Sequence, residues 1–287
     1  MLISFGYSLA ALLVCASWAG AQTSPAAANG IFRIHPLRPI EELRKEALAA
    51  RPPNESGRFR KSDLVELVKL DPPIKLDIRY ATSQNFLSTP MYSQARAFLQ
   101  RSAAEALVRA HRALKAKGYG LLIHDAYRPW YVTKMFWDAT PKDKKIFVAD
   151  PKDGSRHNRG CAVDLTLYDL QTGHEVAMPS LYDEMTQRAY ADYQGGTETE
   201  RQHRTTLRAA MEAQGFKVYP QEWWHFDYKD WRQYPIMNVR FEEIHATKGN
   251  SRTNSKAPTA EHSRDRVFCP TKSKAYAVME EETGHLS

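Results

Sequence analysis

The chain has 287 residues, of which 43% are hydrophobic and 25% are charged. Such a composition is typical of a globular protein and excludes a wholly disordered or fibrous chain. The net charge of +7 arises from 40 basic residues spread among 33 acidic ones. Because no stretch alternates basic with aromatic residues, this charge indicates a mixed, solvated surface and no nucleic-acid partner.

The N-terminal stretch MLISFGYSLAALLVCASWAGAQ has an apolar run near residues 9–14 and then the small residues AGA. This pattern predicts a secretory signal peptide, residues 1–21. The apolar run is too short for a membrane span, which needs about 20 residues. We therefore expect an exported, periplasmic protein with no transmembrane span after cleavage. A lipid anchor at Cys15 is the alternative, although Val14 stands where lipoprotein signals carry a small residue.

Two of the three cysteines, Cys161 and Cys269, remain after this cleavage. Cys161 belongs to a motif described below and Cys269 to a polar tail, so we expect no disulfide between them. A zinc site made of cysteine thiolates is excluded, because such a site needs a cluster of cysteines.

The rest of the sequence predicts one α+β domain, residues 61–245, between two segments of different composition. Residues 22–60 are rich in Ala, Pro, Arg and Asn, which indicates a leader or surface segment. Residues 246–287 begin with a run that has almost no apolar side chains, so we expect a polar, disordered tail.

Apolar periodicity and turn residues predict the elements of this domain in chain order. They are a strand near 74–80, a helix over 96–117 ended by Gly118, a strand from 119 that stops at Pro129, a strand over 161–167, a helix over 200–214 ended by Gly215, and an aromatic strand over 222–228.

The segment SRHNRGCAVDLTL, residues 155–167, places a carboxylate in a stretch that otherwise reads as a buried strand. On a strand, Asp164 lies on the face opposite Val163, which points to the core. A buried carboxylate is costly unless it is paired or bound to a metal. Gly160 permits the tight turn that brings the imidazole of His157 back over Asp164.

The segment EWWHFDY, residues 222–228, surrounds His225 with large aromatic residues. A histidine on such a strand is firmly held and partly dehydrated. Glu222 lies three residues earlier, where we expect the chain to bend into the strand. From there its carboxylate could reach a water molecule on a metal ion held by His225.

These residues together predict a hydrolytic zinc site with an open fourth position, whose three ligands are His157, Asp164 and His225. Such a positive centre acidifies a water molecule, and Glu222 would move its proton to the leaving amine. Arg128, in DAYRPW, offers a cation for the developing oxyanion. Each residue alone has an ordinary explanation, such as a solvent-facing or core histidine or an ion pair, so the prediction depends on the combination.

The first motif resembles the S-x-H-x-x-G-x-A-x-D signature of zinc D-alanyl-D-alanine peptidases, and EWWHF resembles their E-x-W-H element. The double tryptophan is similar to the dipeptidase branch of peptidase family M15, which splits free D-Ala-D-Ala. The segments DIRYATSQNF, residues 77–86, and DAYRPW are also similar to that branch. The resemblance covers roughly residues 65–245.

The resemblance implies one zinc ion per chain, with ligands from His157, Asp164 and His225. It implies Glu222 as the catalytic base and Arg128 as the cation that stabilises the transition state. It also implies that Ser155 lies near the substrate and that Asp183, in SLYDEM, anchors the ammonium group of the dipeptide. The implied fold is a small, mainly antiparallel sheet that carries the zinc and packs against helices, as in the related Hedgehog signalling domain.

We therefore expect an exported zinc dipeptidase that hydrolyses the small dipeptide D-Ala-D-Ala to two D-alanines. One alternative is a D,D-carboxypeptidase or endopeptidase that acts on peptidoglycan stem peptides. Another is a non-catalytic domain that retained zinc for binding, although a pure binder would need neither Glu222 nor Arg128. The sequence does not predict the oligomeric state.

Overall fold

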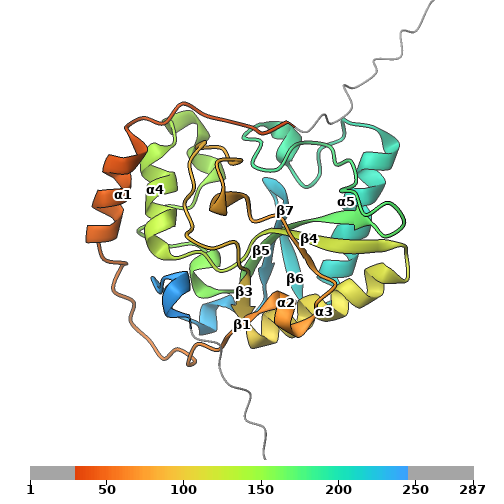
Figure 1. Cartoon of the computed structure of the whole chain (residues 1–287), viewed down its shortest axis with the longest axis horizontal. Helices are drawn as coiled ribbons and strands as arrows, with labels where there is room; N and C mark the ends of the chain where they lie inside the picture. Colours follow the sequence, from red (N-terminus) through yellow and green to blue (C-terminus); the bar gives the residue numbers. More distant parts are fainter. Residues whose placement is uncertain (1–29, 245–287) are drawn as a thin grey trace, which may run out of the picture. The chain divides into compact units, whose positions relative to one another are not determined.

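The computed structural model describes residues 30–244, and a five-stranded sheet lies at their centre (Figure 1). Its strand order is β2-β4-β5-β7-β6, and only the β2–β4 pair is parallel. A separate two-stranded sheet pairs β1 with β3. This arrangement confirms the predicted α+β fold with a mainly antiparallel sheet. The strands are β1 (Leu64–Glu66), β2 (Lys75–Leu76), β3 (Phe98–Gln100), β4 (Tyr119–Asp125), β5 (Ala162–Asp169), β6 (Phe216–Tyr219) and β7 (Glu222–Tyr228).

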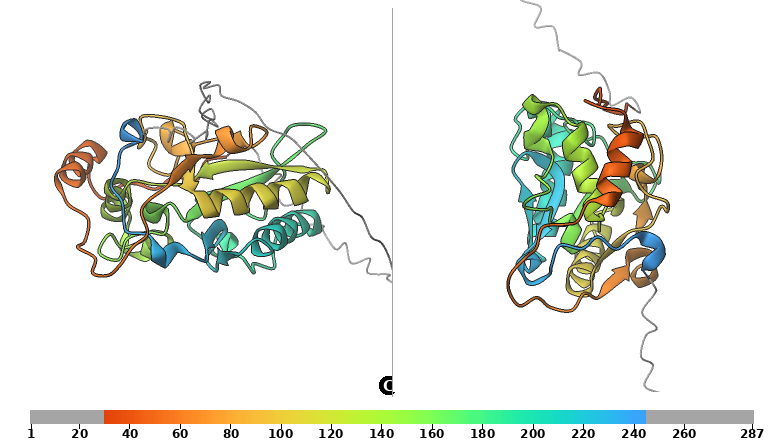
Figure 2. Two further views of the ribbon diagram at one scale, coloured as in Figure 1. Left: turned by 90° about the horizontal axis from the view of Figure 1, so that it is seen from below. Right: turned by 90° about the vertical axis from the view of Figure 1, so that its left-hand side faces the viewer.

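Two long helices, α3 (Arg101–Lys115) and α5 (Glu198–Glu212), contact the strands of the central sheet and each other (Figure 2). Two further helices, α1 (Ile40–Ala49) and α4 (Trp130–Ala139), lie side by side away from them (Figure 1). A short helix, α2 (Leu67–Leu70), links β1 to the loop that leads to β2. None of the helices in residues 30–244 is both long enough and apolar enough to cross a membrane.

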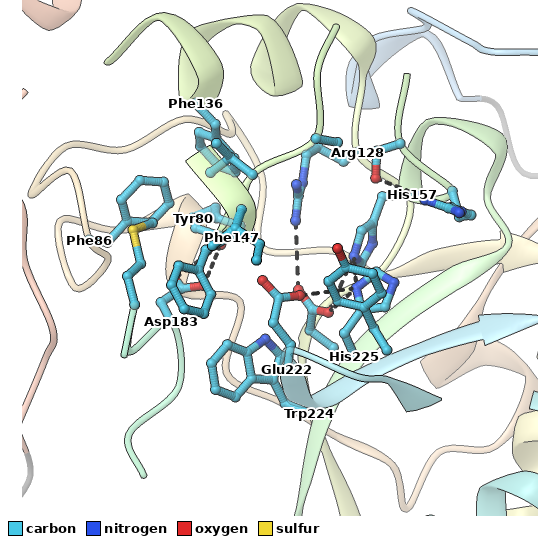
Figure 3. A pocket seen from close by; sticks show the side chains of 18 residues that line it. Tyr80, Phe86, Arg128, Phe136, Phe147, His157, Asp183, Glu222, Trp224 and His225 are labelled. Carbon is cyan, nitrogen blue, oxygen red and sulfur yellow. Dashed lines mark hydrogen bonds and ion pairs between the residues drawn. The ribbon is translucent and has the colours of Figure 1, made fainter. Parts of the chain in front are cut away.

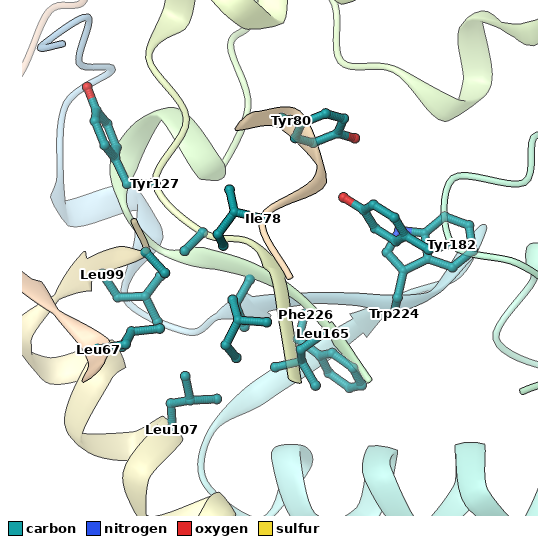
Figure 4. Close-up of a cluster of buried hydrophobic side chains, with 14 of the residues drawn as sticks. Leu67, Ile78, Tyr80, Leu99, Leu107, Tyr127, Leu165, Tyr182, Trp224 and Phe226 are labelled. Carbon is teal, nitrogen blue, oxygen red and sulfur yellow. The ribbon is translucent and has the colours of Figure 1, made fainter. Parts of the chain in front are cut away.

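The core is built where the central strands meet the helices (Figure 4). In β5, Val163, Leu165 and Leu167 are fully buried, as their alternation predicts. The other face of β5 is buried too, and it carries Asp164, which is 3% exposed. A carboxylate in such a place needs partners, and those partners define the functional site.

Both predicted long helices are present, but one starts later than its periodicity suggests. The helix predicted over 96–117 begins at Arg101, because residues 98–100 pair with β1. Gln100 is fully buried and its side chain bonds to the backbone of Asp63 and Arg159. These long-range bonds hold the segment extended, so the local helical pattern is overridden there.

The strand predicted near 74–80 is also shorter than expected. Only Lys75–Leu76 forms a strand, and the backbone N–H of Asp77 still donates to Ile123 in β4. A turn of 3₁₀ helix follows at Arg79–Ala81. The other predicted strands and the helix that ends before Gly215 are present.

The predictions for the two ends of the chain fall mostly outside the described residues. The predicted signal peptide (1–21) and the polar tail (246–287) lie there, and they stay predictions. Part of the predicted leader or surface segment, residues 30–60, is described. It contains α1, whose Leu43 and Ala47 are fully buried.

The turn that joins the two halves of the SRHNRGCAVDLTL motif depends on one glycine. Gly160 has φ +67°, in the left-handed region that favours glycine. A Cβ atom on Gly160 would lie 2.6 Å from the side chain of Leu64 and 3.4 Å from the backbone nitrogen of Gln100. The turn therefore requires both the backbone freedom and the small size of glycine.

We expect Gly160→Ala to lower the free energy of unfolding by about 2–4 kcal/mol, since it adds left-handed strain to overpacking. Gly118→Ala is the matched control, because Gly118 has φ +84° but nothing within 4 Å of its Cβ position. It should cost only about 1–2 kcal/mol, from the left-handed backbone alone. Urea unfolding of both variants measures the difference, and equal losses would contradict the packing part of this explanation.

Candidate functional site

All seven residues predicted from the motifs line one pocket beside the central sheet (Figure 3). The walls of the pocket also include aromatic side chains such as Phe86, Phe136 and Trp224. Residues far apart in the sequence thus converge on one place, as the motifs require. The seven are Arg128, Ser155, His157, Asp164, Asp183, Glu222 and His225.

Strand pairing and one turn bring the three predicted metal ligands together. In the antiparallel β5–β7 pair, Asp164 stands directly opposite His225. His157 lies in a short 3₁₀ helix just before Gly160, whose left-handed backbone turns the chain into β5. The side chains of His157 and Asp164 are only 2% and 4% exposed, and that of His225 is 10% exposed.

The three donor atoms form a nearly equilateral triangle. His157 Nε2 lies 3.1 Å from His225 Nδ1 and 3.2 Å from Asp164 Oδ1. The third side, from His225 Nδ1 to Asp164 Oδ1, measures 3.0 Å. Zinc bonds of about 2.0–2.1 Å in tetrahedral geometry separate neighbouring ligands by about 3.3 Å. The triangle is therefore close to the size that one such ion requires.

The outer hydrogen bonds turn a lone pair of each imidazole toward this triangle. His157 Nδ1 lies 2.6 Å from the carbonyl oxygen of Ala126, which can only accept, so Nδ1 carries the proton. His225 Nε2 lies 2.8 Å from Asp227 Oδ1, and it donates to that carboxylate. In the neutral rings, His157 Nε2 and His225 Nδ1 are then unprotonated. Outer partners of this kind fix the tautomer of metal-binding histidines.

The electrostatics of the triangle favour a positive charge at its centre. Burial opposes ionisation of Asp164, but His157 and His225 hold its pKa well below the usual range. Burial also works against a charged His225, yet the carboxylates of Asp227 and Asp164 raise its pKa to about 10. In the neutral rings, two lone pairs and a carboxylate face one another in a buried site, and either a proton or a metal cation stabilises that arrangement. The three donors therefore fit a divalent metal ion.

Glu222 lies at the beginning of β7, where the register with β6 shifts. Its Oε2 is 3.7 Å from His225 Nδ1, within the same pocket. Burial and the nearby charges of Asp164 and Asp183 raise the pKa of Glu222 to about 8, against the opposing effect of His225. A carboxyl group whose pKa lies near neutrality can both accept and release a proton.

Arg128 approaches the triangle from the opposite wall (Figure 3). Its Nη2 lies 3.6 Å from Asp164 Oδ2, and its side chain is 10% exposed. Asp125 holds it through contacts of 2.9 Å to Nε and 2.8 Å to Nη2. The hydroxyl of Tyr92 donates to the other oxygen of Asp125 at 2.7 Å. The guanidinium is thus fixed in place and kept charged beside the site.

Asp183 marks the end of the pocket away from His157. It has φ +61°, and its carboxylate accepts a hydrogen bond from the Tyr80 hydroxyl at 2.9 Å. Burial and the charge of Asp164 raise the pKa of Asp183 to about 8. Burial and a like charge make the ionised form of Asp183 unfavourable, and a nearby cation would stabilise it. The ammonium group of a ligand would supply that cation. Ser155 lines the same pocket, and its hydroxyl accepts a hydrogen bond from the backbone N–H of His157 at 3.2 Å.

The motif analysis missed three residues that support the site. They are Asp125, which pairs with Arg128, Asp227, which orients His225, and Tyr182, whose hydroxyl donates to Asp164 Oδ2 at 3.0 Å. Sequence signals existed for two of them. Asp125 precedes Arg128 by three residues in DAYRPW, and Asp227 shares the strand face of His225. Tyr182 stands next to Asp183, but nothing in its local pattern points to Asp164.

Cys161 plays no chemical part in the pocket. It is fully buried, and burial raises the pKa of its thiol to about 12. A thiol in that state is inert as a nucleophile or a metal ligand. This agrees with its predicted core position beside Val163.

A second group of possible ligands, Asp77, His124 and Glu175, lies elsewhere in the described chain. Its carboxylates are more open, with side-chain exposures of 42% and 39%. Arg79 already neutralises them, at 2.8 Å from Asp77 and 3.5 Å from Glu175. A metal ion would have to displace this guanidinium, so the His157 triangle is the better metal centre.

Comparisons with known proteins identify the family. A family model described as D-ala-D-ala dipeptidase, of the peptidase M15 group, matches residues 60–247. The D-alanyl-D-alanine dipeptidase of Escherichia coli K12 is 34% identical over 63% of this chain and 92% of its own. Those of Enterococcus faecium and Enterococcus faecalis V583 are 36% and 37% identical, over 55% and 58% of this chain and 87% and 92% of theirs.

A solved LD-carboxypeptidase aligns more distantly, with a TM-score of 0.36 and 20% identity, over 62% of this chain and 74% of that one. The family match covers the strands, the turn and the loop that build the pocket, and the motif residues all lie within it. The chain therefore belongs to the D-Ala-D-Ala dipeptidase family of M15 peptidases.

Proposed function

We propose that the protein hydrolyses free D-Ala-D-Ala to two D-alanines, with one zinc ion held by His157, Asp164 and His225. The triangle of buried donors beside Glu222 and Arg128 carries this proposal. Two imidazoles and one carboxylate are a donor set that zinc takes in hydrolytic sites. When bound, the ion would acidify a water molecule and polarise the scissile carbonyl group.

Glu222 is the proton carrier in this proposal. Its carboxylate accepts a proton from the attacking water molecule and delivers it to the nitrogen of the leaving D-alanine. The position of Oε2, 3.7 Å from His225 Nδ1, puts this carboxylate at the edge of the metal centre. Its raised pKa matches a group that must take up and give back one proton in each turnover.

Arg128 stabilises the negative charge that develops on the carbonyl oxygen. It needs no rearrangement to do so, because Asp125 and the rings of Tyr80 and Phe136 hold the guanidinium in place. A fixed cation in a site with little water stabilises such charge far more than one in solution.

Asp183 and Tyr80 form the recognition end of the pocket. The Asp183 carboxylate binds the free ammonium group of the dipeptide, and Ser155 contacts the substrate on the other side of the metal centre. A stem peptide would present an uncharged amide at Asp183. This difference in charge favours a free dipeptide over the D,D-carboxypeptidase or endopeptidase alternative.

Asp164→Ala should abolish stoichiometric zinc binding, since it removes one of three ligands and leaves two imidazole lone pairs facing each other. The loss of affinity should exceed the 10–100-fold that removal of an outer hydrogen bond typically costs. Glu175→Gln, in the second carboxylate group, is the matched control and should retain zinc. Metal analysis after dialysis measures both; the opposite pattern would assign the metal to the second group.

Glu222→Gln should keep zinc and lower kcat by about 10²–10⁴-fold, because it removes the proton carrier and preserves the ligands. Steady-state hydrolysis of D-Ala-D-Ala, followed by the release of D-alanine at saturating substrate, measures the effect. Glu212→Gln, on an exposed turn of α5, serves as the control. A wild-type protein that binds zinc but cleaves no peptide would instead support the binding-domain alternative.

Asp183→Asn should lower kcat/KM for free D-Ala-D-Ala by roughly 10–100-fold, the value of one charge-assisted hydrogen bond. Hydrolysis of the N-acetylated dipeptide should already be poor in the wild type and should change little in the variant. If the wild type prefers a stem pentapeptide over the free dipeptide, the substrate assignment is wrong and the carboxypeptidase alternative takes its place.

A further inference from the structure

Residues 30–59 precede the part of the chain that the family model matches, yet they contact the walls of the pocket. The backbone N–H of Ile34 donates to the carbonyl oxygen of Phe86, a pocket residue, at 3.0 Å. The N–H of Leu37 donates to Ala139, at the end of α4, at 2.9 Å. Helix α1 then packs along α4, which begins two residues after Arg128 (Figure 1).

Within this segment, Glu55 is bonded to the turn that carries His157. Its Oε1 accepts a hydrogen bond from Arg159 Nη2, and its Oε2 accepts one from the backbone N–H of Ile236, both at 2.6 Å. Arg159 is only 7% exposed, and its other terminal nitrogen donates to the Tyr234 carbonyl oxygen at 2.6 Å. One carboxylate thus neutralises a buried cation and also joins two loops.

These two loops hold the groups of the site. Arg159 follows His157 by two residues in the same 3₁₀ helix. The residue between them, Asn158, accepts from the Met237 N–H at 3.0 Å through its carbonyl oxygen. Its side chain donates to the carbonyl oxygen of Arg128 at 2.8 Å. A change in the 157–159 turn would therefore move a metal ligand and the transition-state cation together.

We propose that Glu55 is a positioning residue for the metal centre, which reaches into the site from a segment outside the matched family region. The Glu55 carboxylate holds the turn that carries His157 next to residues 234–237, because it bonds to both Arg159 and Ile236. Without it, Arg159 is a buried charge that has lost its partner, and the turn shifts to find solvent or another acceptor. This inference rests on the proposed function, because it concerns the same zinc site.

The test compares Glu55→Gln with Glu46→Gln, a control on the same segment that loses only an exposed pair with Arg38. Glu55→Gln should weaken metal affinity by about 10–100-fold, as removal of outer support typically does. It should also alter the visible absorption spectrum of the Co²⁺-substituted protein and lower kcat for D-Ala-D-Ala with little change in KM. Glu46→Gln should match the wild type in every readout.

A second variant separates positioning from folding. Glu55→Gln combined with Arg159→Met removes the unpaired buried charge, so it should recover the thermal midpoint of unfolding. Metal affinity should stay low, because the double variant also lacks the bonds of Glu55 and Arg159 that join the turn to residues 234–237. Wild-type metal affinity and Co²⁺ spectrum in Glu55→Gln would overturn this inference alone, even if that variant is less stable. A wild-type protein that binds no divalent metal would overturn the inference and the proposed function together.

Discussion

The convergence of three hydrogen-bond acceptors in a buried site constrains the rest of the structure. His157 Nε2, His225 Nδ1 and Asp164 Oδ1 lie 3.0–3.2 Å apart, and each imidazole donates its other N–H to a fixed oxygen. Acceptors held so close repel one another unless a cation lies between them. The fold therefore keeps an arrangement that is unfavourable by itself, and it does so with elements that cannot relax: a paired strand, its neighbour and a glycine turn.

Each charged side chain around this triangle is held by a hydrogen-bond or ion-pair partner that lies farther from the metal centre. Arg128 faces Asp164, Asp125 holds Arg128, and the Tyr92 hydroxyl holds Asp125. On the other side, Asp227 orients His225. Because each of these charged groups has a partner, removal of an outer partner leaves a buried charge unpaired and disturbs the metal centre. The same logic extends through Arg159 to Glu55, in a segment that the family motifs do not include.

The sequence predicts the metal ligands and catalytic residues of this site better than the residues that hold them in place. Ligands on a strand and on a tight turn produce recognisable local sequence patterns, such as the carboxylate of Asp164 in an apolar run and Gly160 before it. Supporting contacts join residues with no such pattern: Tyr182 reaches Asp164 from a loop, and Glu55 meets Arg159 across 104 positions. Long-range pairing also decides the start of α3, where bonds from Gln100 override a helical pattern. Tertiary contacts of this kind cannot be deduced from one sequence by periodicity.

X-ray absorption spectroscopy of the zinc-loaded, full-length protein tests the central claim most directly. The account predicts scattering from two imidazoles and from oxygen ligands at about 2.0–2.1 Å, with no sulfur. Replacement of His225 by alanine should remove one imidazole from that spectrum. A sulfur ligand at about 2.3 Å, or a spectrum without histidine, would show that the ion lies elsewhere and would contradict the account.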